Sequence, residues 1–272
     1  MAGQQLVYHY CTVEALMNIL KNRSIRLSDM EKSNDYAERR WMQEMIAEEF
    51  CHLMPDAYEK QREFRACFQS FTEQKNLYAA CFSEKPDLLS QWRAYAMDGR
   101  GVAIGFEKTA FNEAANPAVR FLKICYDQEK ERVYARTQAE EIYRLLGNGL
   151  SMKEVVCAVY GKTEVELSVM KNPAFEEEQE WRICLAAAPE ACTVPSHIKE
   201  GFCLSPVRIY YSNYRLISYI ELEFSKKKDR MVKEIILGPK CRLEKRDVQM
   251  CLGLWGYEKE RVQILQSSAT YS

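Results

Sequence analysis

The chain has few of the features that would place it in a functional class at once. Its 272 residues include 38 basic and 39 acidic side chains, so the formal net charge of −1 favours neither nucleic acid nor an anionic membrane as a partner. There are only three histidines and no Cys-x-x-Cys pair, and the longest apolar runs are too short to span a bilayer. We therefore expect a protein that holds no metal and does not cross a membrane.

The sequence also lacks linkers rich in glycine, proline or serine, and it has no internal repeat. These two absences predict a single domain over residues 1–272. Eleven cysteines are scattered along the chain, several of them in apolar runs, where a thiol behaves as a small hydrophobic group. Because the number is odd and no secretory leader precedes them, we expect reduced thiols and a cytoplasmic location.

Short β-rich runs and blocks of helical periodicity are present instead. Strands are predicted at residues 6–10, 24–28, 77–83, 101–106, 119–126, 179–187, 207–211, 216–224, 231–238 and 261–265. Helices are predicted at residues 13–22, 33–72 with a break at Pro55, 86–97, 127–170 and 243–253. This arrangement predicts an α+β fold with a central mixed or antiparallel sheet. Residues 127–170 form a helical insertion packed on one side of the sheet, and the lysine-rich segment 226–230 is interpreted as a hairpin loop.

Negative charge is concentrated in the stretch FEEEQEWR, residues 175–182, just before an apolar run. In a strand, residues two apart share a face, so Glu178, Glu180 and Arg182 point the same way. A carboxylate at such a strand end can stabilise positive charge that develops in a transition state, and Arg182 would keep Glu180 ionised. The alternative is an ordinary ion pair at the end of a strand, and the spacing alone favours that alternative.

Four further residues are candidates for a binding site. His9 lies on the first predicted strand, and Ser83 ends the third, where free backbone amides can hold a carboxamide or a phosphate. Trp92 and Tyr95 are three residues apart and share a helix face, so they can stack on a flat ring. The alternative for His9 and for the aromatic pair is packing in the core. The glycines of GRGVAIG, residues 99–105, lack the strand-then-helix context of a phosphate-binding loop.

Several of these segments together resemble the bacterial DUF2971 family. The most specific ones are the Glu-x-Glu-Trp-Arg and Trp-x-x-Tyr segments. The resemblance covers residues 6–265 and rests on YHYCTVEALMNILKNRSIRLS, NDYAE, CFSEK, QWRAYAMDGRGVAIGF, AFEEEQEWRI and VKEIILGPKC. It does not assign a role to Asn34, Asp35 or Glu38 in the acidic NDYAE segment.

The order of the candidate residues is also similar to that in ADP-ribosyltransferases. This similarity implies that His9 binds a ribose of NAD and that Ser83 holds the nicotinamide amide. Tyr95 would stack on the nicotinamide ring, with Tyr78 or Trp92 as a second stacking residue. Glu180 would stabilise the ribosyl cation.

Glu178 would complete the Glu-x-Glu form seen in some of these transferases, with Arg182 beside it. The fold implied is ADP-ribosyltransferase-like, NAD is the substrate, and no metal is needed. The resemblance implies transfer or hydrolysis of ADP-ribose, with a protein or nucleic-acid acceptor, in a setting such as bacterial anti-phage defence. Two alternatives remain open: a non-catalytic ligand-sensing or protein-interaction module that retains the pocket, and a metal-free enzyme that processes nucleic acid.

Overall fold

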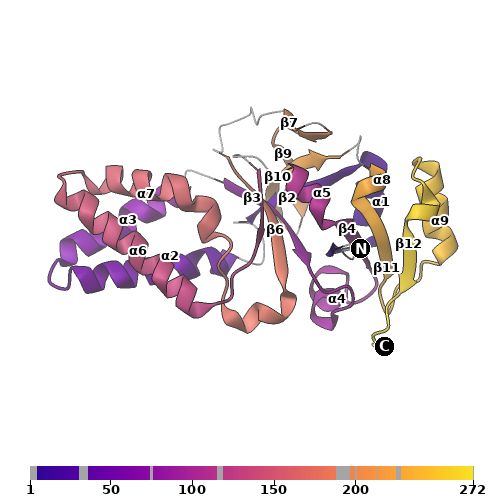
Figure 1. The fold of residues 1–272 in the computed structure, drawn as a ribbon, viewed down its shortest axis with the longest axis horizontal. Coiled ribbons are helices and arrows are strands. Elements are labelled where there is room, and N and C mark those ends of the chain that lie inside the picture. The colour runs from indigo at the N-terminus through magenta and orange to yellow at the C-terminus, as the bar shows by residue number, and fades with distance from the viewer. Residues whose placement is uncertain are drawn as a thin grey trace.

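The computed structural model describes residues 5–30, 36–73, 76–114, 119–187, 197–199, 201–212, 214–224 and 228–271 (Figure 1). The strands are β1 (Leu6–Cys11), β2 (Ser24–Asp29), β3 (Asn76–Ser83), β4 (Val102–Glu107), β5 (Val119–Lys123), β6 (Glu180–Ala187), β7 (His197–Lys199), β8 (Phe202–Leu204), β9 (Arg208–Ser212), β10 (Arg215–Glu223), β11 (Val232–Leu237) and β12 (Gln263–Gln266). The helices are α1 (Val13–Asn22), α2 (Tyr36–Leu53), α3 (Tyr58–Glu73), α4 (Leu89–Tyr95), α5 (Lys108–Ala114), α6 (Gln128–Gly147), α7 (Met152–Leu167), α8 (Lys228–Met231) and α9 (Lys245–Leu254), with 3-10 turns η2 (Pro173–Glu178) and η4 (Lys259–Arg261).

Among the described residues, twelve strands form one mixed sheet, which branches at β3 and at β10. One edge of β3 pairs with β6 along its whole length, from Asn76 opposite Ala187 to Ser83 opposite Glu180. Its other edge pairs with β1 near Ser83 and with β2 near Ala79. The strands that carry His9, Ser83 and Glu180 therefore lie next to one another in the sheet. Most pairs are antiparallel and β11 with β12 is parallel, so the predicted α+β fold with a mixed sheet is confirmed.

Helices cover both faces of this sheet. Apolar residues of α1, α5, α8 and α9 join the largest core cluster on one face. Helix α1 starts at Val13 because the Thr12 side chain accepts a hydrogen bond from the Ala15 backbone N–H, and it buries Leu16 and Leu20. On the other face, Trp92 of α4 packs edge-on against Tyr10.

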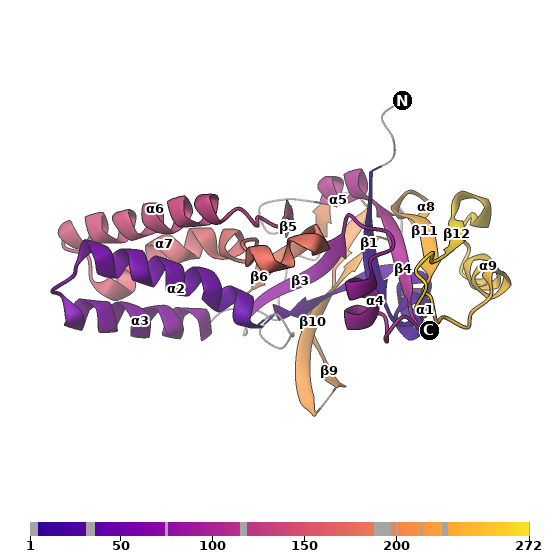
Figure 2. The same cartoon turned by 90° about the horizontal axis from the view of Figure 1, so that it is seen from below.

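Four helices form a bundle with a core of its own at one end of the molecule, opposite the end that holds α9 and β12 (Figures 1 and 2). Helices α2 and α3 connect β2 to β3, and helices α6 and α7 lie between β5 and β6. The bundle core contains stacked aromatic rings such as Phe64 against Phe68. The helices predicted within 127–170 therefore pack on α2 and α3 rather than on a face of the sheet, because their apolar faces meet the apolar faces of those two helices.

Two local predictions were wrong. The helix predicted at 86–97 spans only Leu89–Tyr95, so Pro86 precedes it instead of occupying its first turn. The segment after β10 is not a hairpin loop, since β10 pairs with β2, β8 and β9, whereas β11 pairs with β4 and β12. Residues 226 and 227 of the lysine-rich segment lie outside the described residues, and Lys228–Met231 form the short helix α8.

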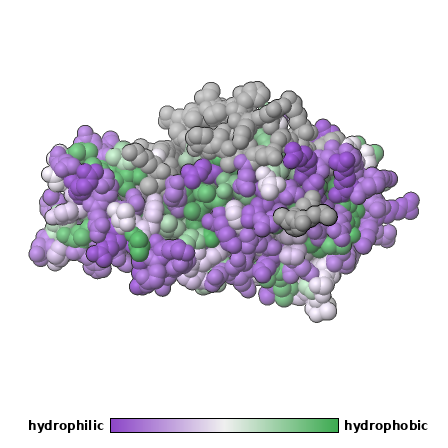
Figure 3. Space-filling view, in the orientation of Figure 1, coloured by the Kyte–Doolittle hydropathy of each residue, from purple (hydrophilic) through white to green (hydrophobic). Residues whose placement is uncertain are grey.

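Strands β9 and β10 form a hairpin that projects from the rest of the sheet (Figure 2). Ile209, Tyr211 and Leu216 lie on one face of it, because Tyr211 pairs with Leu216 across the two strands and Ile209 is two residues from Tyr211. Together with Tyr214, these apolar side chains are between 64% and 94% exposed. Figure 3 shows another face, which is mostly hydrophilic with smaller apolar patches.

Candidate functional site

The candidate site is a cluster of four charged side chains at the start of β6. Glu180 and Arg182 lie on the same face of that strand, as the alternation predicts. Lys171 follows α7, and Glu178 ends the 3-10 turn that connects α7 to β6. The Asn172 side chain caps this turn with Pro173 at its first position, and Gln179, with φ 45°, reverses the chain into the strand.

Two ion pairs are centred on the Glu180 carboxylate. Arg182 Nε lies 2.5 Å from Glu180 Oε1 and Arg182 Nη2 lies 2.9 Å from Glu180 Oε2, which is a bidentate arrangement. Lys171 Nζ bridges the two acids, at 3.1 Å from Glu180 Oε2 and 2.7 Å from Glu178 Oε2. Two carboxylates and two cations therefore neutralise each other within the cluster.

Burial makes this neutralisation necessary. Arg182 is 0% exposed, Lys171 1% and Glu180 5%, and an unpaired charge at such positions would be strongly destabilising. Arg182 Nη1 also donates to the Ser168 carbonyl oxygen at 2.7 Å. The Glu180 backbone N–H donates to the Tyr126 hydroxyl at 3.1 Å, and burial raises the pKa of that hydroxyl. The cluster thus joins the end of α7 to strand β6 of the sheet.

Burial by itself would raise the pKa of Glu180, but the positive charges of Arg182 and Lys171 outweigh it and lower the pKa to about 2. Glu180 is therefore ionised at neutral pH. The Glu180 carboxylate is already paired with Arg182 and Lys171, so these ion pairs fix its position before any ligand binds.

A small cavity lies next to the cluster. It has a volume of about 30 Å³, which is room for about one or two water molecules. Its lining residues are Tyr10, Cys81, Phe82, Gln91, Tyr95, Glu178 and Glu180.

Five of the predicted site residues come together around this cavity. Tyr95, Glu178 and Glu180 line it, and Arg182 is bonded to Glu180. Ser83 is the β3 residue opposite Glu180, and its hydroxyl donates to the Glu178 carbonyl oxygen at 2.6 Å and accepts from the Lys85 N–H at 3.0 Å. Ser83 therefore fixes the turn that presents Glu178.

The other three predicted residues do not join them. His9 and Tyr78 belong to the opposite face of the sheet: the His9 ring packs on Phe82, and Tyr78 lies in the main core. His9 Nδ1 lies 2.9 Å from the Cys81 carbonyl oxygen, and burial lowers the pKa of His9. Trp92 is 0% exposed, and its indole N–H donates to Asp87 at 2.6 Å, so its ring is part of the core.

Sequence reasoning missed Lys171, Ser168 and Tyr126. They precede the acidic stretch by too many residues for a strand or helix period to connect them with Glu180. The one available signal was Asn172-Pro173, a turn signature that returns the chain so that Lys171 meets Glu178. Asn34 and Asp35 lie outside the described residues, and only the backbone of Glu38 is described.

The cavity is much smaller than a typical small-molecule site, which has about 300–1,000 Å³. With the side chains in these positions, there is no room beside Glu180 for a nicotinamide ring. Within the described part of the chain, no group of three or more His, Cys, Asp or Glu side chains has a geometry that could hold a metal ion. Over the same residues, no helix is both long enough and apolar enough to cross a membrane.

Comparison with protein families found a match to part of the chain. Residues 91–183 match the model of the family described as "Protein of unknown function (DUF2971)". The match supports the DUF2971 resemblance. The matched segment starts one residue before Trp92 and ends one residue after Arg182, so it includes the two most specific motifs, whereas residues 1–90 and 184–272 lie outside it. Comparisons with curated proteins and with solved structures gave no significant match, so neither supports the similarity to ADP-ribosyltransferases.

Proposed function

We propose that the protein is a non-catalytic ligand-sensing or protein-interaction module. The observation that carries this proposal is the state of Glu180, whose carboxylate is buried and bonded to Arg182 and Lys171 next to a cavity of about 30 Å³. A catalytic carboxylate has to face the atom at which charge develops. Glu180 instead faces two side chains of its own protein, as a structural ion pair does.

The same contacts offer a route from the cavity to the helical bundle. Glu178 lines the cavity and is bonded to Lys171, which follows α7. A cationic group that reaches the Glu178 carboxylate, whose side chain is 14% exposed, competes with Lys171 for it and so changes the support of the last turn of α7. Because α7 packs in the bundle core, a contact at Glu178 is coupled to the bundle.

The β9–β10 hairpin supports the protein-interaction part of the proposal. Ile209, Tyr211 and Leu216 place an exposed apolar strip on it, and β9 pairs with β10 and with no other strand in the described residues. Tyrosine and arginine are enriched among the residues that dominate binding energy in protein interfaces, and the hairpin carries both. This combination suits a protein partner that packs on the strip.

Incubation with labelled NAD tests the non-catalytic assignment. We expect neither transfer of ADP-ribose nor release of nicotinamide above the level of a heat-denatured control. Turnover above that control would overturn the proposal, and a drop of about a hundredfold or more in Glu180→Gln, measured where both proteins are folded, would assign the activity to Glu180. Such a result would establish the transferase alternative instead.

Amide hydrogen exchange tests the coupling between the cavity and the bundle. Glu178→Gln removes the charge that holds Lys171, so amide exchange should become faster in residues 165–172. Glu176→Gln is the matched control, because Glu176 lies on the same turn and its side chain is exposed. Equal exchange in both variants would show that Glu178 does not connect the cavity to α7.

ADP-ribosyl transfer is the second candidate. The observation in its favour is that Ser83, Tyr95 and Glu180 lie around one cavity, as that chemistry requires. ADP-ribosyl transfer requires the cavity to widen. It also requires the Glu180 carboxylate to leave one of its ion pairs and contact the substrate. His9 would have no part in it, since its ring lies on the other face of the sheet.

A further inference from the structure

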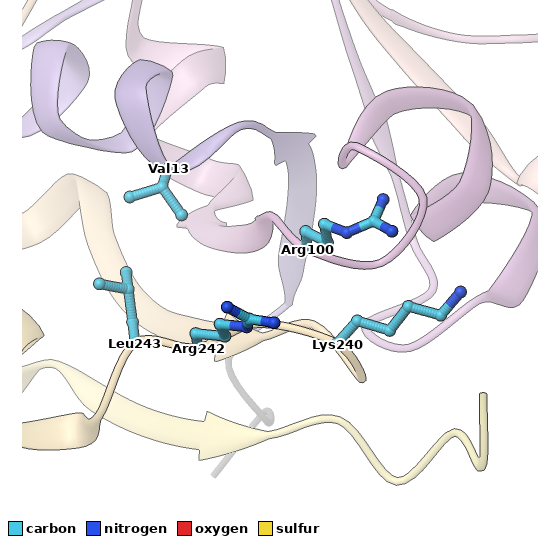
Figure 4. Close-up of a pocket in the computed structure, with 5 residues that line it drawn as sticks. All are labelled: Val13, Arg100, Lys240, Arg242 and Leu243. Carbon is cyan, nitrogen blue, oxygen red and sulfur yellow. The ribbon is translucent and has the colours of Figure 1, made fainter. Parts of the chain in front are cut away.

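A second, larger cavity is lined by residues that are far in sequence from the acidic stretch 175–182. It has a volume of about 480 Å³ and is lined by Val13, Arg100, Lys240, Arg242 and Leu243. Figure 4 shows Val13 and Arg100 on one side and the residues of the 240–243 segment on the other. Three separate parts of the sequence meet here: the start of α1, the turn before β4 and the segment between β11 and α9.

Positive charge is in excess in this basic pocket. Asp98 is 3.1 Å from Lys240 Nζ and 3.8 Å from Arg100 Nη1, so one carboxylate is shared by two cations. Arg242 is exposed and forms no ion pair with any residue that the structure describes. At the nearby start of α9 the Asp247 carboxylate accepts a hydrogen bond from the Glu244 N–H at 2.8 Å, and the positive end of the α1 dipole lies at Val13.

The walls of the basic pocket are fixed by close backbone contacts. Met97, Asp98 and Gly99 have φ values of 50°, 56° and 83°, a left-handed turn that two non-glycine residues adopt at a cost. The Lys240 N–H donates to the Gly99 carbonyl oxygen at 2.8 Å, and the Gly238 N–H donates to that of Gly101 at 3.0 Å. These bonds hold Arg100 and Lys240 in place before any ligand binds.

We propose that the basic pocket binds a phosphorylated small molecule about the size of a mononucleotide. Arginine side chains bind phosphate oxygens in a bidentate manner, and Arg100 and Arg242 supply two guanidinium groups. Val13 and Leu243 supply an apolar wall for the organic part of the ligand. The volume lies within the range of small-molecule sites. This inference does not depend on the proposed function, because the two cavities share no lining residue.

Isothermal titration calorimetry with ADP, adenosine and inorganic phosphate tests the proposal on the full chain. We expect ADP to bind, its affinity to fall as salt is added, and adenosine to bind at least tenfold more weakly. Inorganic phosphate should also bind more weakly than ADP, because it cannot use the apolar wall. Adenosine binding as tightly as ADP, or no ADP binding at millimolar concentration, overturns the proposal. Phosphate binding as tightly as ADP overturns the role given to Val13 and Leu243.

Arg242→Ala is the decisive variant because Arg242 is exposed, so its truncation should leave the fold intact. It should weaken ADP binding about tenfold or more. Lys245→Ala is the matched control, since Lys245 is exposed, carries the same charge and lies three residues away without lining the pocket. Equal losses in the two variants would mean that ADP responds only to the general charge of this surface and would overturn the assignment.

Discussion

The cluster at Glu180 and the basic pocket at Arg242 both contain charged side chains, but the charges are paired in the cluster and in excess in the pocket. In the cluster, two carboxylates balance two cations and Arg182 is fully buried. In the basic pocket, three cations have one carboxylate between them and Arg242 is exposed. Matched charges inside a protein stabilise its fold, whereas an open pocket keeps unmatched charge available for a ligand. The acidic stretch is the more conspicuous charged segment in the sequence. The unpaired charge available to a ligand, however, is that of Arg242 in the basic pocket.

Arg182→Ala should have the largest effect on stability. It leaves Glu180 with Lys171 as its one close cation among the described residues and opens space in the interior, so we expect a loss of about 3–5 kcal/mol in the free energy of unfolding. Urea denaturation monitored by circular dichroism measures this loss. Arg136→Ala is the control, because its ion pair with Glu140 is exposed and worth about 0–1 kcal/mol. Similar losses in the two variants would contradict the assignment of the cluster as structural.

Glu180→Gln should change how stability depends on pH. Because the pKa of Glu180 falls from 4.5 to about 2 on folding, its ionised form contributes about 3 kcal/mol above pH 4.5. That contribution is lost as the pH falls from about 5 towards 2. The difference in unfolding free energy between wild type and Glu180→Gln should therefore shrink across this range. A difference that is constant between pH 7 and pH 3 would mean that the Glu180 charge does not stabilise the fold.

Gly238→Ala should damage the basic pocket and leave the cluster intact. A Cβ at this position would lie 2.5 Å from the Gly99 carbonyl oxygen and 2.8 Å from that of Gly101, so the backbone has to move. We expect a loss of about 1–3 kcal/mol in stability and weaker ADP binding. Gly253→Ala is a control of opposite sign, because nothing lies within 4 Å of its Cβ and alanine favours the helix by about 0.5–1 kcal/mol. Thermal unfolding of both variants checks the contrast.

The sequence predicted the strand face at Glu180 because alternation needs only local information. The same holds for the order of most elements and for the α+β class, since hydrophobic periodicity decides them. The hairpin predicted across residues 226–230 was wrong because strand partners depend on the whole sheet: β11 pairs with β4 and β12 rather than with β10. Periodicity says that a strand exists without saying which strand lies beside it.

Which residues line the two cavities also depends on contacts between segments far apart in the sequence. Lys171 reaches Glu180 only through the turn at Gln179, and Arg100 meets Arg242 only after β4 and β11 have paired. GRGVAIG was discounted because it does not open a helix. Its glycines act differently: a Cβ on Gly101 would lie 2.2 Å from the Cys11 carbonyl oxygen, so glycine is needed for the close approach of two chain segments. No motif in a single stretch contains that information.

The smallest effect on stability is expected at the β9–β10 hairpin. Tyr211 and Leu216 face each other across the two strands and are 67% and 64% exposed, so little of their surface leaves water when the protein folds. Substituting both with serine should change the free energy of unfolding by less than about 0.5 kcal/mol at each position. Tyr219→Ser is the comparison on the same strand, because Tyr219 is 8% exposed and packs against Tyr210, and it should cost several times more. If the double variant is destabilised as much as Tyr219→Ser, the strip supports the fold and is not free for a partner. If its stability is unchanged, the apolar side chains of the hairpin do nothing for folding, which is what a surface used for contact requires.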